Sequence, residues 1–169
     1  MIPVQVLAVQ YLANAAPGLC AGLGIPPGFP SLAMLTTDCD DATYIALDAA
    51  TKAAEVEAAY ARSFYAGSAN ASTPNAGEVI GILAARTPDA ARSGMEAVLR
   101  TLEQVGFEDL DGVPCLAHTV SSVGSFLAAE AGVPLGSAVA YLIAPPLEAM
   151  FALDEALKAV DVILAKLYA

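Results

Sequence analysis

Asp38, Asp40 and Asp41, which surround Cys39, are the polar residues of this sequence that point most directly to chemistry. They fall between a predicted strand over 32–36 and a predicted helix over 41–55. A carboxylate in this position caps the helix and complements its dipole, which stabilises by about 0.5–2 kcal/mol. One carboxylate suffices for capping, however, and three so close together repel one another. The cluster therefore has two interpretations, a helix cap or a site for a small cation.

The other reactive residues form no catalytic or metal-binding pattern. His118 is the only histidine, and although three serines follow it within seven residues, a triad is defined by positions in space and not by proximity in sequence. The sequence has no GxSxG, phosphate-binding glycine loop or HExxH motif. Its three cysteines are an odd number without CxxC spacing. The residues predict no disulfide framework, zinc site, cofactor or enzyme activity.

Composition favours a chain that meets other protein subunits. Hydrophobic residues make up 57% of the 169 residues and charged residues 15%, which is more apolar than an ordinary soluble domain. The net charge of −11, with scattered basic residues, argues against nucleic-acid binding. Prolines and glycines interrupt the charge-free segment 1–37, so no membrane span or secretory signal is expected there. We predict a cytosolic protein whose surplus apolar surface faces other subunits.

An internal repeat organises the chain. A shift of 106 positions aligns 31–59 with 137–165 without a gap, and it pairs Ala46-Leu47-Asp48 with Ala152-Leu153-Asp154. Upstream, Gly24-Ile25-Pro26 corresponds to Gly132-Val133-Pro134. In the second copy Ala144-Pro145-Pro146-Leu147 stands where the first has the acidic cluster. The repeat predicts two domains, 1–108 and 109–169, and a second copy that lacks the last strand and helix of the first.

Periodicity and turn residues predict the elements of each copy. Polar residues over 66–76 indicate a loop, and the acid- and glycine-rich segment 106–112 indicates a linker between the copies. Thr87 and Pro88 begin the clearest amphipathic helix. The expected strands are 4–11, 32–36, 56–65 and 78–84, and the expected helices are 16–23, 41–55 and 88–104.

Three long stretches resemble a known family: DDATYIALDAATKAAEVEAAYARSFYAG, AGEVIGILAARTPDAARSGMEAVL and AYLIAPPLEAMFALDEALKAVDV. They are similar to the EutL family, the tandem-domain shell proteins of bacterial ethanolamine-utilisation microcompartments. The resemblance covers essentially the whole chain. It implies an α/β (α+β) fold of two circularly permuted microcompartment domains, each an antiparallel sheet with flanking helices. Three chains would form a homotrimeric, pseudohexameric tile that adjoins other shell proteins in the bacterial cytoplasm.

The resemblance also implies a role for the acidic cluster. Asp40 and Asp41 match the family's paired aspartates in a small pore within each subunit, and Glu78 matches the glutamate that faces them. Tyr65 and Phe107 match aromatic residues near this pore. The implied ligand is ethanolamine, whose ammonium suits carboxylates and aromatic faces. A gated passage on the three-fold axis is the family's second route for metabolites.

Three alternatives stay open at this level. A shell protein of a related propanediol or amino-alcohol compartment would share the fold and differ in its pore residues. A soluble ligand-sensing regulatory domain could also be duplicated and acidic. An enzyme is the weakest of the three, because no catalytic motif supports it.

Overall fold

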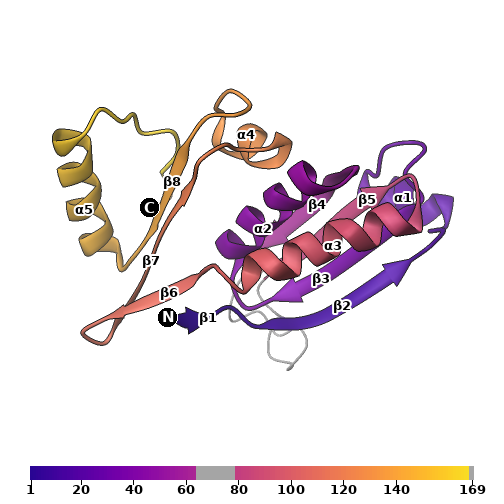
Figure 1. Cartoon of the computed structure of the whole chain (residues 1–169), viewed down its shortest axis with the longest axis horizontal. Helices are drawn as coiled ribbons and strands as arrows, with labels where there is room; N and C mark the ends of the chain where they lie inside the picture. The colour runs from indigo at the N-terminus through magenta and orange to yellow at the C-terminus, as the bar shows by residue number, and fades with distance from the viewer. Residues whose placement is uncertain (64–78, 168–169) are drawn as a thin grey trace.

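The first copy of the repeat forms a four-stranded antiparallel sheet in a computed structural model that describes residues 1–63 and 79–167. The strand order is β2-β3-β5-β4, and all three pairings are antiparallel. The strands are β2 (Val6–Leu12), β3 (Ser31–Thr37), β4 (Val56–Ser63) and β5 (Val79–Ala85). Helices α2 (Asp40–Ala53) and α3 (Pro88–Leu102) lie side by side on one face of this sheet (Figure 1).

The central strands β3 and β5 are buried on both faces. Leu35 and Leu83 point to the main core with α2 and α3. Their neighbours Leu32 and Ile82 face a second cluster, which includes side chains of α1 (Pro17–Leu23). Successive side chains of a strand point to opposite faces, so both faces of the sheet must be apolar. This double burial accounts for the uninterrupted apolar runs of the sequence here.

A second sheet is built from the other end of the chain and from the N-terminus. Its order is β1-β6-β7-β8, again antiparallel, and Figure 1 shows it beside the first sheet. The strands are β1 (Ile2–Pro3), β6 (Gly106–Leu110), β7 (Val113–Val120) and β8 (Val139–Ile143). Helices α4 (Ser125–Ala131) and α5 (Pro146–Ala159) accompany them.

The structure confirms the repeat at the level of elements. Helices α2 and α5 are both 14 residues long and start 106 positions apart. Helices α1 and α4 are both seven residues long, and each ends at a left-handed glycine, Gly24 with φ 69° and Gly132 with φ 68°. A positive φ suits glycine because it has no Cβ. The fold is the mixed α/β arrangement expected from the sequence.

The prediction that residues 106–112 form a linker is wrong. Residues 106–110 form β6, which pairs with β1 on one side and β7 on the other. Leu110 pairs with Val113, so Asp111 and Gly112 are the whole turn, and both have positive φ, 56° and 87°. Asp-Gly is a favoured two-residue hairpin turn. Acidic composition obscured the strand, and one of its two partners, β1, lies at the N-terminus of the chain.

Other expectations differ only at their ends. The first strand was expected over 4–11 and corresponds to β2, while β1 is a separate short strand that ends before the expected range begins. The strand expected over 56–65 is described to Ser63, and the loop expected over 66–76 lies outside the described residues. The domain boundary expected between 108 and 109 falls within β6.

Candidate functional site

The junction between β3 and α2 is fixed by buried threonines and not by the aspartates. The Cys39 N–H donates to Thr37 Oγ1 at 3.2 Å, and Thr43 Oγ1 donates to the Cys39 carbonyl at 2.8 Å. The two threonine hydroxyls are themselves 2.7 Å apart. Both threonines are fully buried, which satisfies the polar groups where the chain turns. The carboxylates that follow are therefore not needed to hold this turn together.

Each of the three aspartates has a different environment. Asp38 Oδ1 accepts a hydrogen bond of 2.8 Å from the Gln5 N–H. Asp40 Oδ1 accepts from the Asp41 N–H at 2.8 Å, and Asp40 Oδ2 accepts from the hydroxyl of Ser63 at the end of β4. In the described part of the chain, the Asp41 carboxylate has no hydrogen-bond or ion-pair partner. Asp41 is thus the carboxylate most available to a ligand.

Burial and neighbouring acids raise the pKa of Asp41 to about 6. Burial is the largest cause, followed by the charges of Asp40 and then Glu130. Removing a carboxylate from water and placing it near like charges both favour its protonated form. A cation next to Asp41 would relieve this repulsion, so the electrostatics favour a cationic ligand.

Glu130 and Tyr44 belong to this neighbourhood although sequence reasoning missed them. Glu130 comes from α4 in the second copy and accepts a 2.6 Å hydrogen bond from Lys166 Nζ. The Tyr44 hydroxyl lies 3.4 Å from Ser63 Oγ, and burial raises the tyrosine pKa. Tyr44 is four residues after Asp40 on one helix, a spacing that could have identified it. No sequence signal links Glu130 to Asp41.

The other predicted site residues are placed as follows. Glu78 and Tyr65 lie outside the described residues. In sequence Glu78 directly precedes Val79, the first residue of β5, which pairs with Ser63 and with Thr37. Phe107 lies on β6 in the other sheet, opposite Ile2, and packs half-buried against the main core. Of the predicted site residues that the structure describes, Asp40 and Asp41 therefore lie together, and Phe107 lies in the other sheet.

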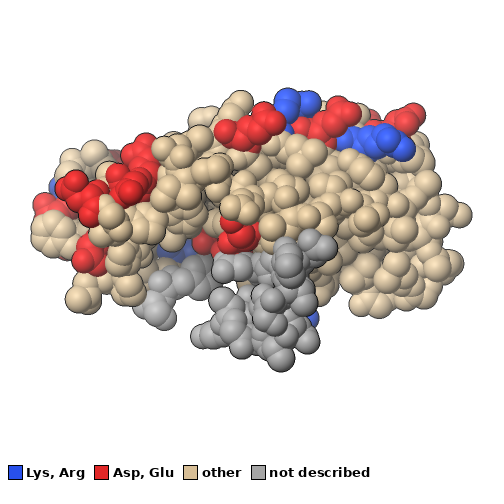
Figure 2. Space-filling model, turned by 90° about the horizontal axis from the view of Figure 1, so that it is seen from below, with Lys and Arg blue, Asp and Glu red and all other residues tan. Residues whose placement is uncertain are grey.

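Acidic side chains dominate the charged surface. Figure 2 shows one face of the molecule, where red Asp and Glu side chains outnumber blue Lys and Arg. No group of three or more His, Cys, Asp or Glu side chains suited to a metal ion occurs within 1–63 and 79–167. Over the same residues, every helix is too short or too polar to cross a membrane.

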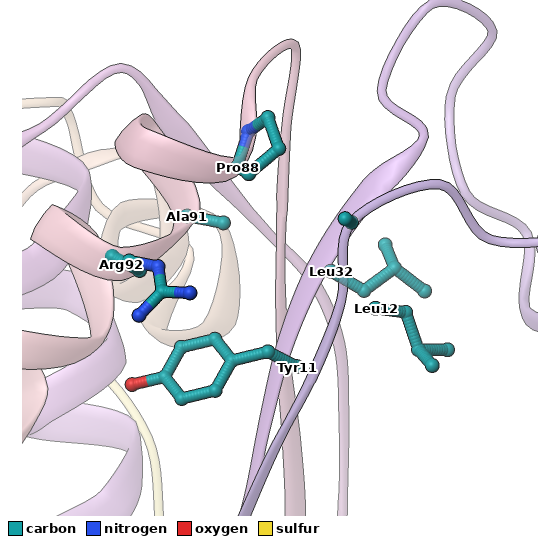
Figure 3. A pocket seen from close by; sticks show the side chains of 7 residues that line it. Tyr11, Leu12, Leu32, Pro88, Ala91 and Arg92 are labelled. Carbon is teal, nitrogen blue, oxygen red and sulfur yellow. The ribbon is translucent and has the colours of Figure 1, made fainter.

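A small apolar pocket lies away from this site, between β2, β3 and the start of α3 (Figure 3). Its volume is about 30 Å³, which is room for one water molecule. The Arg92 guanidinium lies 5.5 Å from the centroid of the Tyr11 ring at its edge. The pocket is too small to offer a site for a metabolite.

Comparisons with known proteins identify the fold. A relative named bacterial microcompartment shell protein EutL, from Clostridium perfringens, is 51% identical over 100% of this chain and 80% of its own length. The crystal structure of the ethanolamine utilization protein EutL from Leptotrichia buccalis superposes with a TM-score of 0.87 at 49% identity, covering 95% of this chain and 76% of that one.

A more distant neighbour shares the fold alone. The trimeric bacterial microcompartment shell protein PduB is 16% identical with a TM-score of 0.74, covering 91% of this chain and 68% of that one. No protein-family model matches the sequence.

The fold and these similarities define a shell protein of bacterial microcompartments. Within that class, the chain belongs to the EutL family. It is accordingly a shell subunit, located in the microcompartment shell in the bacterial cytoplasm. Neither a related propanediol compartment nor a ligand-sensing regulatory domain is favoured by the relatives.

Proposed function

We propose that this chain is a non-enzymatic subunit of a homotrimeric, pseudohexameric tile in the shell of an ethanolamine-utilisation microcompartment. Each chain supplies two shell domains, 1–108 and 109–169, and the tile adjoins other shell proteins. The apolar excess of the sequence and the tandem repeat support this assembly. So does membership of a family of shell proteins.

Within the tile, Asp40, Asp41 and Glu78 line a small pore in each subunit through which ethanolamine passes. The observation that carries this proposal is the Asp41 carboxylate, which is partly buried, lies next to a second carboxylate and has no hydrogen-bond or ion-pair partner among the described residues. Ethanolamine brings an ammonium group that neutralises this pair and a hydroxyl that accepts or donates a hydrogen bond. Tyr65 and Phe107 would add cation–π attraction of about 0.5–2 kcal/mol.

Binding at this pore also favours the closed state of the gated passage on the three-fold axis. A ligand shifts such an equilibrium only by its difference in affinity for the two states. The proposal therefore requires that ethanolamine binds more tightly to the closed tile. Comparing its affinity in tiles trapped open and closed would measure that difference, and equal affinities would contradict gating.

Isothermal titration calorimetry of ethanolamine against the assembled protein tests the pore. D40A, D41N and E78A should each weaken binding at least tenfold, because each removes a carboxylate from the ammonium. The matched control is D38N, since Asp38 is the third acid of the cluster but is occupied by the Gln5 N–H. Unchanged affinity in both D40A and E78A would refute the site.

A second titration tests the class of ligand. Propanediol has a similar size and no charge, so it should bind far more weakly than ethanolamine to the wild-type protein.

Electron microscopy of the purified chain tests the tile independently, because shell subunits should form flat sheets. A chain that forms no sheets but binds ethanolamine would retain the pore and contradict the tile.

A further inference from the structure

Helix α4 of the second copy packs beside α2 of the first copy, and the two helices run in opposite directions (Figure 1). Near the end of α2, Lys52 Nζ donates to the Ser122 carbonyl, just before α4, at 2.8 Å. One turn earlier on α2, the Asp48 carboxylate accepts hydrogen bonds from N–H groups at the start of α4. One turn earlier again, the Tyr44 ring lies 5.7 Å from the Phe126 ring, centroid to centroid. The contacts therefore advance along α4 as they return toward the start of α2.

Glu130 is the next residue of α4 in this series of contacts. It follows Phe126 by four residues, and Asp41 precedes Tyr44 by three. Residues at these spacings share one face of a helix, so Glu130 lies on the side of α4 that meets the start of α2. Burial is the main cause of the raised pKa of Asp41 and of Tyr44, and the charge of Glu130 raises both further. Geometry and electrostatics thus place Glu130 beside the acidic pair.

The Glu130 carboxylate already binds a primary ammonium group. Lys166 Nζ donates to Glu130 Oε1 at 2.6 Å and to the Glu130 carbonyl at 2.9 Å. The Lys166 side chain is 40% exposed and the Glu130 side chain is 39% exposed, so small solutes reach both. Because a carboxylate has two oxygens and about four acceptor positions, it can hold this lysine and still attract a second cation.

We propose that Glu130 is a specificity-determining residue of the acidic site, contributed to the first copy of the repeat by the second. It lies across the contact between α2 and α4 from Asp41, and it draws a primary ammonium ligand toward Asp40 and Asp41. The Tyr44 and Phe126 rings, one turn away, supply the apolar surface next to these acids. This inference rests on the proposed ethanolamine pore and adds a residue to it.

Glu130 sets specificity through its charge. Three carboxylates, those of Asp40, Asp41 and Glu130, gather at the site, and Lys166 offsets one of them. This excess of negative charge favours a cation over a neutral molecule of the same shape. It also opposes any ligand that carries a carboxylate of its own, because like charges repel. Free L-serine is such a ligand, since it is ethanolamine with a carboxylate added.

Calorimetry of the full chain with ethanolamine and with free L-serine tests this role. The variant exchanges the two charges, E130K with K166E, so the ion pair and the net charge are kept while a positive charge faces Asp41. Ethanolamine affinity should fall about tenfold or more, and the preference for ethanolamine over serine should fall by at least as much. The matched control is E155K with K158E, which exchanges an exposed ion pair on α5 and should leave both affinities within about twofold.

A carbon-13 NMR titration of the Asp41 carboxyl group gives a readout that does not depend on a ligand. Replacing Glu130 by an uncharged residue in E130Q should lower the pKa of Asp41, and the charge exchange should lower it further. Asp40 and Tyr44 also carry ionisable side chains at this site, and they are unchanged in both variants. A residue that only supports the packing of α4 would not shift this pKa while the fold is intact, which circular dichroism checks.

The outcomes separate this inference from the pore itself. A wild-type chain that binds ethanolamine, with an affinity, a preference over serine and an Asp41 pKa that the charge exchange leaves unchanged, would overturn the role of Glu130 and leave the pore. A wild-type chain that binds no ethanolamine would overturn the pore and this role with it. Weaker ethanolamine binding with an unchanged preference would also overturn the specificity role. Reduced affinity and preference, together with a lowered pKa and an unaffected control, would establish it.

Discussion

The substitution D48A tests how the two repeats are held together within one chain. Asp48 is fully buried, and its carboxylate accepts N–H groups from Gly124 and Leu127 at 2.8 and 2.9 Å. Alanine removes the acceptor and leaves both N–H groups without a partner at a place closed to water. The nearby Lys52 also loses its ion pair, but its side chain is 37% exposed and can be hydrated.

The magnitude follows from these contacts. Each buried donor left unsatisfied costs about 1–3 kcal/mol, so the two together cost about 2–6 kcal/mol. Loss of the partly exposed ion pair adds less than about 1 kcal/mol. We expect D48A to lower the free energy of unfolding by about 2–7 kcal/mol, a large part of the stability of a domain of this size.

Urea denaturation followed by circular dichroism, at one protein concentration for all variants, measures this loss. The control is E96A on α3, where the Glu96 to Arg100 pair has the same i,i+4 spacing at 4.0 Å but both side chains are exposed. It should change the free energy of unfolding by less than about 0.5 kcal/mol. A loss below about 1 kcal/mol for D48A, or one no larger than for E96A, would refute the reasoning.

Two further predictions concern the site and the sheet. The pKa of Asp41 is raised to about 6 from 3.8, so the folded state loses stability as pH rises from about 4 to 6, where the unfolded chain ionises first. D41N should therefore gain stability over wild type at pH 7 and show no gain at pH 4, as urea midpoints would reveal; an equal gain at both values would contradict the shift. In β5, a Cβ on Gly81 would lie 2.9 Å from Leu35 Cδ2 and 3.0 Å from Leu47 Cδ1, so G81A should destabilise by about 1–3 kcal/mol in thermal melts. The control G22A, with nothing within 4 Å, should cost far less, and equal melting temperatures for the two variants would contradict the packing argument.

Local patterns in the sequence were sufficient to predict most elements and the repeat. The helix expected over 88–104 is α3, because Thr87 caps it and its apolar residues recur at helical spacing. The gapless alignment of 31–59 with 137–165 agrees with the equal lengths of α2 and α5 in the structure. These features depend on residues close together in the chain, and such residues determine local geometry.

Pairings across the chain were not predictable in the same way. Residues 106–110 were expected to be a linker, and they form a strand because Ile2 and Pro3 lie alongside them. The proximity of Glu130 to Asp41 likewise depends on how α4 packs against α2. The local periodicity of a segment does not indicate which distant segment will pack against it in the fold.

In the acidic cluster too, the residue types were evident from the sequence, but their contacts depended on the tertiary structure. From the residue pattern alone, Asp38, Asp40 and Asp41 were equivalent candidates for a helix cap or a cation site, and the family resemblance singled out Asp40 and Asp41. The structure separates them, because Asp38 is held by the Gln5 N–H, Asp40 by the Ser63 hydroxyl, and Asp41 is left available. The hydrogen-bond partners of Asp38 and Asp40 come from other strands or segments, so their roles could not be read from the cluster alone.

The two copies of the Ala-Leu-Asp segment show most clearly which properties the local sequence determines and which the tertiary structure determines. The sequence by itself determined that Asp48 and Asp154 occupy the same helical position, each four residues before a lysine. Only the tertiary structure decided that Asp48 is buried beneath α4 whereas Asp154 is exposed. The reason is physical: a helical position is set by the backbone hydrogen bonds of neighbouring residues, but burial is set by which surface arrives to cover it.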